Sequence, residues 1–213
     1  MREARDALIL NGLLAAGGWA VFQYLHAPML GLGIAALVLA YNILLPMFAR
    51  AGGHGHWFDL WWFLLPLSIC QVVPDWVLSQ MVGILGFPDL GAPRIGTVPA
   101  YMAGMWVIPL FWILLLSRGS PALAGLFALL VFAAAEWAAP KFGLWHPRNV
   151  ATFQGVAHYV LLPEALLGWA AAWAYRDVAS SGLVPRLLAA AGVSVFYTGA
   201  LIVSYFLMQR AGL

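Results

Sequence analysis

The chain has 213 residues, of which 64% are apolar and only 8% are charged, and its mean hydropathy is +0.90. A soluble domain of this length does not bury so large an apolar fraction, so the composition predicts a polytopic integral membrane protein. The formal net charge of +2 is too small to favour nucleic acid as a partner. The single cysteine excludes disulfides and thiolate metal clusters within one chain.

Apolar runs separated by proline- and glycine-containing breakers predict seven transmembrane helices. They are expected at about 7–25, 29–49, 58–85, 99–117, 122–139, 156–175 and 185–209. The third helix contains Pro66 and Pro74 and should therefore be kinked or tilted. The sequence predicts an all-α fold, a polytopic membrane helix bundle that forms one integral membrane domain over residues 1–213.

An odd number of spans places the two chain ends on opposite sides of the membrane. Six arginines would lie on the N-terminal side and four basic residues on the other: Arg2, Arg5, Arg50, Arg118, Arg176 and Arg186 against Arg94, Lys141, Arg148 and Arg210. By the positive-inside rule the N-terminus is expected to be cytoplasmic, and we expect an inner-membrane protein of a bacterium.

The two longest connections, at 86–98 and 140–155, both fall on the side opposite the N-terminus. They are dense in proline, glycine and aromatic residues, whereas flexible linkers are richer in serine. Loops of this composition are expected to be ordered and to carry function. We therefore expect two caps folded over one end of the bundle.

Four carboxyl groups interrupt these apolar stretches. An ionisable side chain at membrane depth costs at least ~2.5–3.5 kcal/mol on insertion scales and indicates a functional role. The predicted helix directions place Asp75, Glu136 and Glu164 in the same half of the bundle, beneath the two caps. Asp59 instead begins the third helix at the opposite surface, where the helix dipole favours an acid.

Two of these acids, Asp75 and Glu164, directly follow a proline. A proline releases the backbone carbonyl one turn earlier, here at Cys70 and at Tyr159. Such a carbonyl can accept the proton of a neutral carboxylic acid, and apolar surroundings also favour the neutral form. The three acids are therefore candidate catalytic groups that donate a proton to a substrate.

Polar and aromatic residues near these acids are candidates for binding a substrate. Aromatic faces stabilise a carbocation by cation–π attraction, worth ~2 kcal/mol or more when desolvated. The predicted substrate-binding residues are Gln71, Trp76, Trp106, Trp137, Trp145, His158, Tyr159 and Tyr197.

Other readings of the polar residues remain open at this point. Each acid could simply pair with a basic or hydroxyl neighbour and lock helix packing, with Arg94, Arg148, His146, His158, Tyr197 and Tyr205 as candidate partners. A metal could bind at His54 and His56, or between Glu136, His146, His158 and Glu164. No helical spacing typical of a metal site occurs, so we expect no metal and no cofactor.

The segment from Glu136 to Glu164 reads E-x6-G-x-W-x-P and then G-V-A-x-Y-V-L-L-P-E. This order of acid, glycine, aromatic residue and proline resembles the membrane carotenoid hydratase and lycopene cyclase group. In size, helix count and intramembrane acids the chain also resembles the small seven-helix membrane-bound terpene cyclases. It lacks the paired-glutamate motif of the heterodimeric lycopene cyclases. The resemblance implies an isomerase or lyase of isoprenoid biosynthesis that protonates its substrate with a carboxylic acid.

The sequence thus predicts a membrane-embedded, cofactor-independent terpene or isoprenoid cyclase, or a related isomerase or hydratase. Its partners would be a hydrophobic isoprenoid and the lipid bilayer. One alternative is a small transporter or a lipid-binding protein that uses the same acids as a proton relay or as binding groups. Another is a non-catalytic assembly or pigment-binding subunit.

Overall fold

The computed structural model describes residues 2–212, except for the side chains of residues 209–211, so Gln209 and Arg210 lie outside the described side chains. The chain is an all-α helix bundle, as predicted. Over the described residues seven helical segments follow one another. They are α1 (Arg2–Tyr24), α2 (Met29–Gly52), the continuous run α3 (Gly55–Cys70), α4 (Val72–Trp76) and η1 (Val77–Val82), the pair α5 (Met102–Met105) and α6 (Val107–Ser117), α7 (Pro121–Phe142), α8 (His158–Val178) and α9 (Leu183–Ala211).

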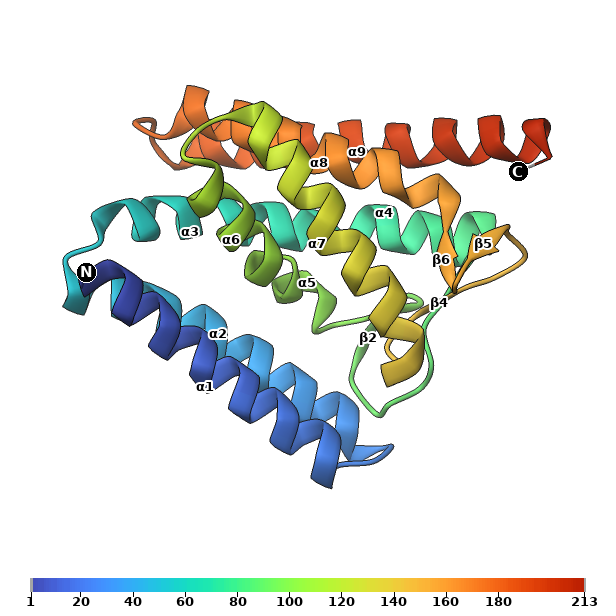
Figure 1. The fold of residues 1–213 in the computed structure, drawn as a ribbon, viewed down its shortest axis with the longest axis horizontal. Helices are drawn as coiled ribbons and strands as arrows, with labels where there is room; N and C mark the ends of the chain where they lie inside the picture. Colours follow the sequence, from blue (N-terminus) through green and yellow to red (C-terminus); the bar gives the residue numbers. More distant parts are fainter. Residues whose placement is uncertain (1, 213) are drawn as a thin grey trace.

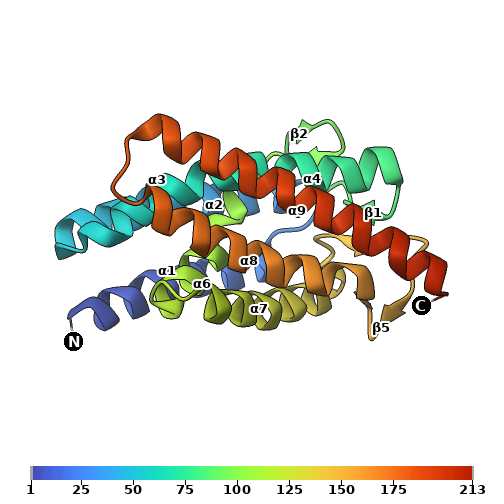
Figure 2. The ribbon, with the colours of Figure 1, turned by 90° about the horizontal axis from the view of Figure 1, so that it is seen from above.

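Five of these segments are long and apolar enough to cross a membrane. They are Arg2–Tyr24, Met29–Gly52, Gly55–Val82, Pro121–Phe142 and Leu183–Met208, while Met102–Ser117 is a shorter apolar helix. The α8 helix packs between α7 and α9 (Figure 2). Many of its residues are buried there, which explains how this less apolar helix fits into the bundle.

The third helical segment is interrupted one turn before Pro74, in the helix that was predicted to be kinked or tilted. The α-helix stops at Cys70 and resumes at Val72, and the last turns of the run form a π-helix. Because Pro74 has no N–H, the Cys70 carbonyl accepts instead a hydrogen bond of 2.9 Å from the Ser194 hydroxyl of α9. This carbonyl therefore has a partner from another helix, and not one of the acids that follow the prolines.

The helices run between two different ends of the molecule (Figure 1). We call the open end the one that holds the N-terminus and the short connections at 53–54, 118–120 and 179–182. We call the capped end the one that holds the connections 83–101 and 143–157. The predicted sidedness of the loops is thus confirmed within the described residues.

The two caps are ordered and hydrogen-bonded to each other. In the first cap, β2 (Arg94–Ile95) and β3 (Val98–Pro99) form a hairpin, and β5 (Thr152–Phe153) and β6 (Val156–Ala157) form one in the second. Between the caps, β1 (Leu85–Gly86) pairs antiparallel with β4 (His146–Pro147). Each strand has only two residues, so these pairs fix the caps without changing the fold class.

Gly86 lies at the contact between the caps. A β-carbon there would collide with Arg148 and would lie 2.7 Å from Nε2 of His146. The Arg148 backbone N–H donates to the Ile84 carbonyl at 2.8 Å, which continues the contact beyond the two strands. With glycine at this position, the side chains of the second cap pack directly against the backbone of the first.

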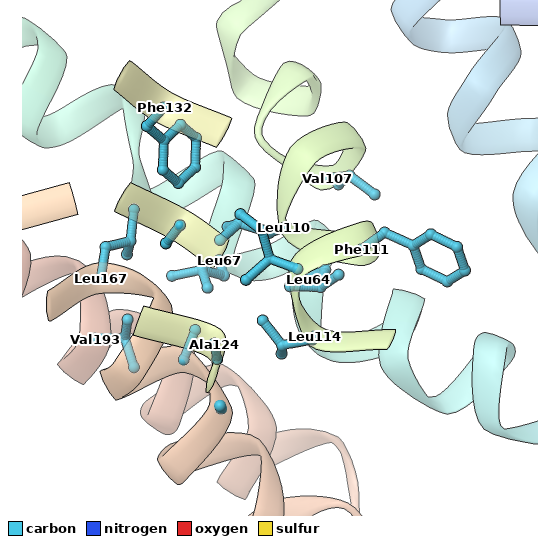
Figure 3. Close-up of a cluster of buried hydrophobic side chains, with 14 of the residues drawn as sticks. Leu64, Leu67, Val107, Leu110, Phe111, Leu114, Ala124, Phe132, Leu167 and Val193 are labelled. Atoms are coloured by element: carbon cyan, nitrogen blue, oxygen red, sulfur yellow. The ribbon is translucent and has the colours of Figure 1, made fainter. Parts of the chain in front are cut away.

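An apolar core fills the middle of the bundle between the two ends (Figure 3). Leu64 and Leu67 of α3, Leu110 of α6 and Leu167 of α8 are fully buried in it. Toward the capped end the same cluster includes Phe132, Tyr159 and Tyr197, which also line the candidate site.

Candidate functional site

The three predicted catalytic acids line one cavity of about 250 Å³ beneath the caps. Asp75 comes from α4, Glu136 from α7 and Glu164 from α8. Both caps also contribute to the walls, for example through Phe87 from the first cap and Trp145 from the second. Helices that are separate in sequence thus bring all three carboxyl groups to one space.

The rest of the cavity wall is largely apolar and aromatic. Phe132 lies one helical turn before Glu136 on α7, and its ring contacts Trp106 with 5.3 Å between centroids. Tyr197 of α9 packs on the other side of Trp106 at 6.0 Å. The remaining apolar lining includes Leu78, Leu85, Met102, Met105, Ile108, Pro109, Ala135, Val160 and Leu201.

Two of the acids are held by indole groups. Nε1 of Trp145 donates to Oε1 of Glu136 at 2.8 Å, and Nε1 of Trp106 donates to Oδ2 of Asp75 at 3.4 Å. Glu164 differs, because its Oε2 is buried and has no hydrogen-bond partner among the described residues. The two tryptophans therefore fix two carboxyl groups and leave the third available to a ligand.

None of these acids forms an ion pair with a described basic side chain. The ion pairs that the described residues form all involve other acids, namely Glu3, Asp6 and Asp59. Arg94 donates instead to the carbonyls of Thr97 and Pro88, at 2.8 Å each. An ionised carboxylate without a counter-ion is costly in an apolar cavity, so this site favours neutral carboxylic acids.

Among the predicted substrate-binding residues, Trp106, Trp145, Tyr159 and Tyr197 line the cavity. Trp76 and Trp137 do not line this cavity, and the two residues are 38% and 48% exposed. Each follows an acid directly in sequence, and a helix of 3.6 residues per turn rotates the next side chain by about 100°. Lys141 Nζ lies 2.8 Å from the centroid of the Trp137 ring, on the outside of α7.

Gln71 and His158 also lie outside this cavity. Gln71 is fully buried at the break between α3 and α4, and neither polar atom of its side-chain amide has a partner among the described residues. Further along the same run, the Ser79 hydroxyl contacts Thr97 Oγ1 of the first cap at 2.6 Å. The π-helix that begins at Val77 changes the rotation between Gln71 and Ser79.

The acid at the open end has a different role from the three in the cavity. The Asp59 side chain is half exposed, and its Oδ1 lies 3.4 Å from Nη2 of Arg186. His54 and His56 each pair with a carboxyl group of α1. No group of three or more His, Cys, Asp or Glu side chains that could hold a metal occurs among the described residues.

Sequence reasoning missed several apolar residues of the wall. Phe132 could have been predicted from the sequence, because a residue four positions before Glu136 lies on the same helix face. Met102 and Met105 of the short helix α5 carried no signal, since nothing local shows that this helix faces the acids.

The comparison with known families finds one match, over residues 72–208, to a family described as "Domain of unknown function (DUF6989)". The matched region is more than half of the chain. The chain belongs to this family. The match includes all three cavity acids and both caps, so the site lies within the part that defines the DUF6989 domain. The searches of curated proteins and of solved structures found no match.

Proposed function

We propose that this DUF6989 protein is a membrane-embedded, cofactor-independent enzyme that protonates an alkene or epoxide of an isoprenoid. The protonated substrate would then cyclise, isomerise or add water. One observation carries the proposal. Three carboxyl groups share one apolar, aromatic cavity in which no described basic side chain forms an ion pair with them.

The contacts in the cavity suggest a division of roles. Glu164, whose Oε2 has no partner, is the proposed general acid. Its O–H bond breaks as a new C–H bond forms at one alkene carbon, and the other alkene carbon becomes the cation. A neighbouring alkene or water then attacks this cation, or the cation loses a proton. The Glu164 carboxylate left by the first step would take up the final proton, while Asp75 and Glu136 are held by their tryptophans.

The cavity walls suit a reaction that passes through a cation. The faces of Trp106, Phe132 and Tyr197 attract positive charge by cation–π interaction. Both caps contribute to a largely apolar cavity wall, which limits access of water to a reactive intermediate. Premature capture by bulk water would thus be reduced.

The packing below the cavity argues against the transporter alternative. A carrier needs polar groups on both sides of the midplane, and Leu64, Leu67 and Leu110 fill this region (Figure 3). Asn42, a polar residue of the open half, donates to the carbonyls of Val38 and Gly104.

The proposal places the enzyme in a bacterial inner membrane. The arginines at the open end are the reason for placing that end in the cytoplasm.

The test follows hydrogen atoms from solvent into product. The purified protein in lipid nanodiscs is incubated in deuterium oxide with farnesol or 10,11-epoxyfarnesol, and carbon-bound deuterium and cyclised products are measured by mass spectrometry. Glu164→Gln should lower product formation at least ~100-fold, the low end for loss of a general acid. Asp59→Asn at the open end is the matched control and should change it less than twofold. Full activity of Asp75→Asn, Glu136→Gln and Glu164→Gln alike would refute carboxyl protonation.

A further inference from the structure

A second, smaller cavity of about 140 Å³ lies next to the acid cavity. Tyr159 lines both of them and is 3% exposed, so its side chain forms part of the wall between the two spaces. The second cavity lies where the second cap meets α8 and the C-terminal part of α9. We call it the polar chamber, after the residues described next.

Several side chains that can form hydrogen bonds line the polar chamber. His158, Asn149 and Tyr205 line it, and each of these side chains carries a group that can form hydrogen bonds. The Tyr205 ring is itself fixed by an edge contact with Tyr159, with centroids 5.7 Å apart. Residues with hydrogen-bonding groups therefore line a cavity at the capped end of the bundle.

Charge restricts what such a chamber can accept. Neither the chamber nor the acid cavity is lined by a described lysine or arginine. A diphosphate would meet no lysine or arginine among the described lining residues and would lie beside three acids, which is unfavourable. A hydroxyl or carbonyl group needs only hydrogen-bond partners, and His158 and Asn149 can each donate and accept.

The distance between His158 and Glu164 along α8 indicates the length of the substrate. Glu164 follows His158 by six residues on this helix, which corresponds to ~9 Å at ~1.5 Å per residue. An extended chain covers ~3.5 Å with three bonds, so ~9 Å corresponds to about eight bonds, or about two isoprene units. At ~30 Å³ per water-sized group, the acid cavity of about 250 Å³ takes roughly eight non-hydrogen atoms.

We propose that the substrate is an amphipathic isoprenoid of about ten to fifteen carbons with a neutral hydroxyl or carbonyl head. The head binds in the polar chamber through His158 and Tyr205, and the hydrocarbon passes Tyr159 into the acid cavity. The alkene near Glu164 then lies about two isoprene units from the head. This inference rests on the proposed function and names its substrate class.

The test uses two photoreactive probes with the protein in lipid nanodiscs. One probe is a farnesol analogue with a diazirine at the hydrocarbon end, and the other is the same molecule without the hydroxyl. Labelled peptides are identified by mass spectrometry. In the wild type the hydroxyl probe should label acid-cavity residues at least tenfold more than the deoxy probe. His158→Leu and Tyr205→Phe should each reduce this preference at least threefold while deoxy labelling stays within twofold, which also shows that the variants are folded.

The control is His26→Leu, which replaces an exposed histidine at the same end of the bundle and should keep the wild-type preference. An unchanged hydroxyl preference in both chamber variants would overturn the polar chamber and leave the proposed function standing. A third probe carries a diphosphate in place of the hydroxyl, and stronger labelling by it would also overturn the polar chamber, because the proposed head is neutral. Absence of acid-cavity labelling by any probe would refute the proposed function itself.

Discussion

Carboxyl groups have different partners at the two ends of this molecule. At the open end each of three acids contacts a basic side chain: Glu3 with His56, Asp6 with His54, and Asp59 with Arg186. At the capped end Asp75, Glu136 and Glu164 form no ion pair with a described basic residue, and the first two accept hydrogen bonds from tryptophans.

The difference separates structural acids from functional ones. Acids that only join helices are expected to have partners, because a buried group without one costs free energy. The pair of Asp6 and His54 fits this description, since it ties α1 to the turn before α3 at 3.0 Å. The capped-end acids lack such partners and border an unfilled space, an arrangement that costs stability and suits a ligand.

The largest effect is expected from giving the capped end a basic partner. Phe132→Lys places an ammonium group one turn from Glu136 on the cavity wall. A nearby cation favours ionised carboxylates, which have no proton to donate, so product formation should fall more than ~100-fold, as for loss of a general acid. Phe132→Met is the control of similar apolar character and should retain activity within ~5-fold. Equal activity of the two variants would contradict the role assigned to unpaired acids.

A smaller effect is expected from removing one indole donor. Trp145→Phe keeps an aromatic ring in the cavity and deletes the N–H that donates to Glu136 at 2.8 Å. A hydrogen bond to an acid of this kind contributes about 1.5 kcal/mol, or roughly tenfold in turnover. Trp137→Phe, on the exposed face of the same region, should leave turnover unchanged. A loss of the same size in both variants would show that the effect is not specific to Glu136.

The open end should respond in stability and not in activity. His54→Leu removes the partner of Asp6, so the melting temperature in detergent should fall by several degrees. Turnover per folded molecule should stay within about twofold, because the pair lies at the far end from the acid cavity. His26→Leu, at an exposed position, should leave both quantities unchanged. A large loss of turnover in His54→Leu at unchanged stability would contradict the assignment of structural acids to the open end and functional acids to the capped end.

Much of this arrangement could be predicted from the sequence. The position of a residue along its helix shows how far it lies from each end of the bundle. Helices of ~20 apolar residues at ~1.5 Å per residue span the hydrocarbon region. Their order along the chain then assigns each loop to one end. This was sufficient to place Asp75, Glu136 and Glu164 near one end and Asp59 near the other, and to identify the two caps there.

The direction in which each side chain points was harder to predict. Trp76 and Trp137 were assigned to the pocket because they adjoin acids in sequence, and the rotation between successive helical residues places them outside. The sequence already contained that signal. It contained none for Met102 or for the hydrogen bond from Ser194 to Cys70, because both depend on which helix packs beside which.

The sequence by itself determined the all-α fold, the seven helical segments and the gathering of three acids at the end with the long loops. These follow from hydrophobic length and chain direction, which are local properties. Only the tertiary structure decided that the acids border one cavity, that two of them accept hydrogen bonds from tryptophans, and that β1 and β4 join the caps. These depend on contacts between residues far apart in the chain, and packing of the whole bundle selects them.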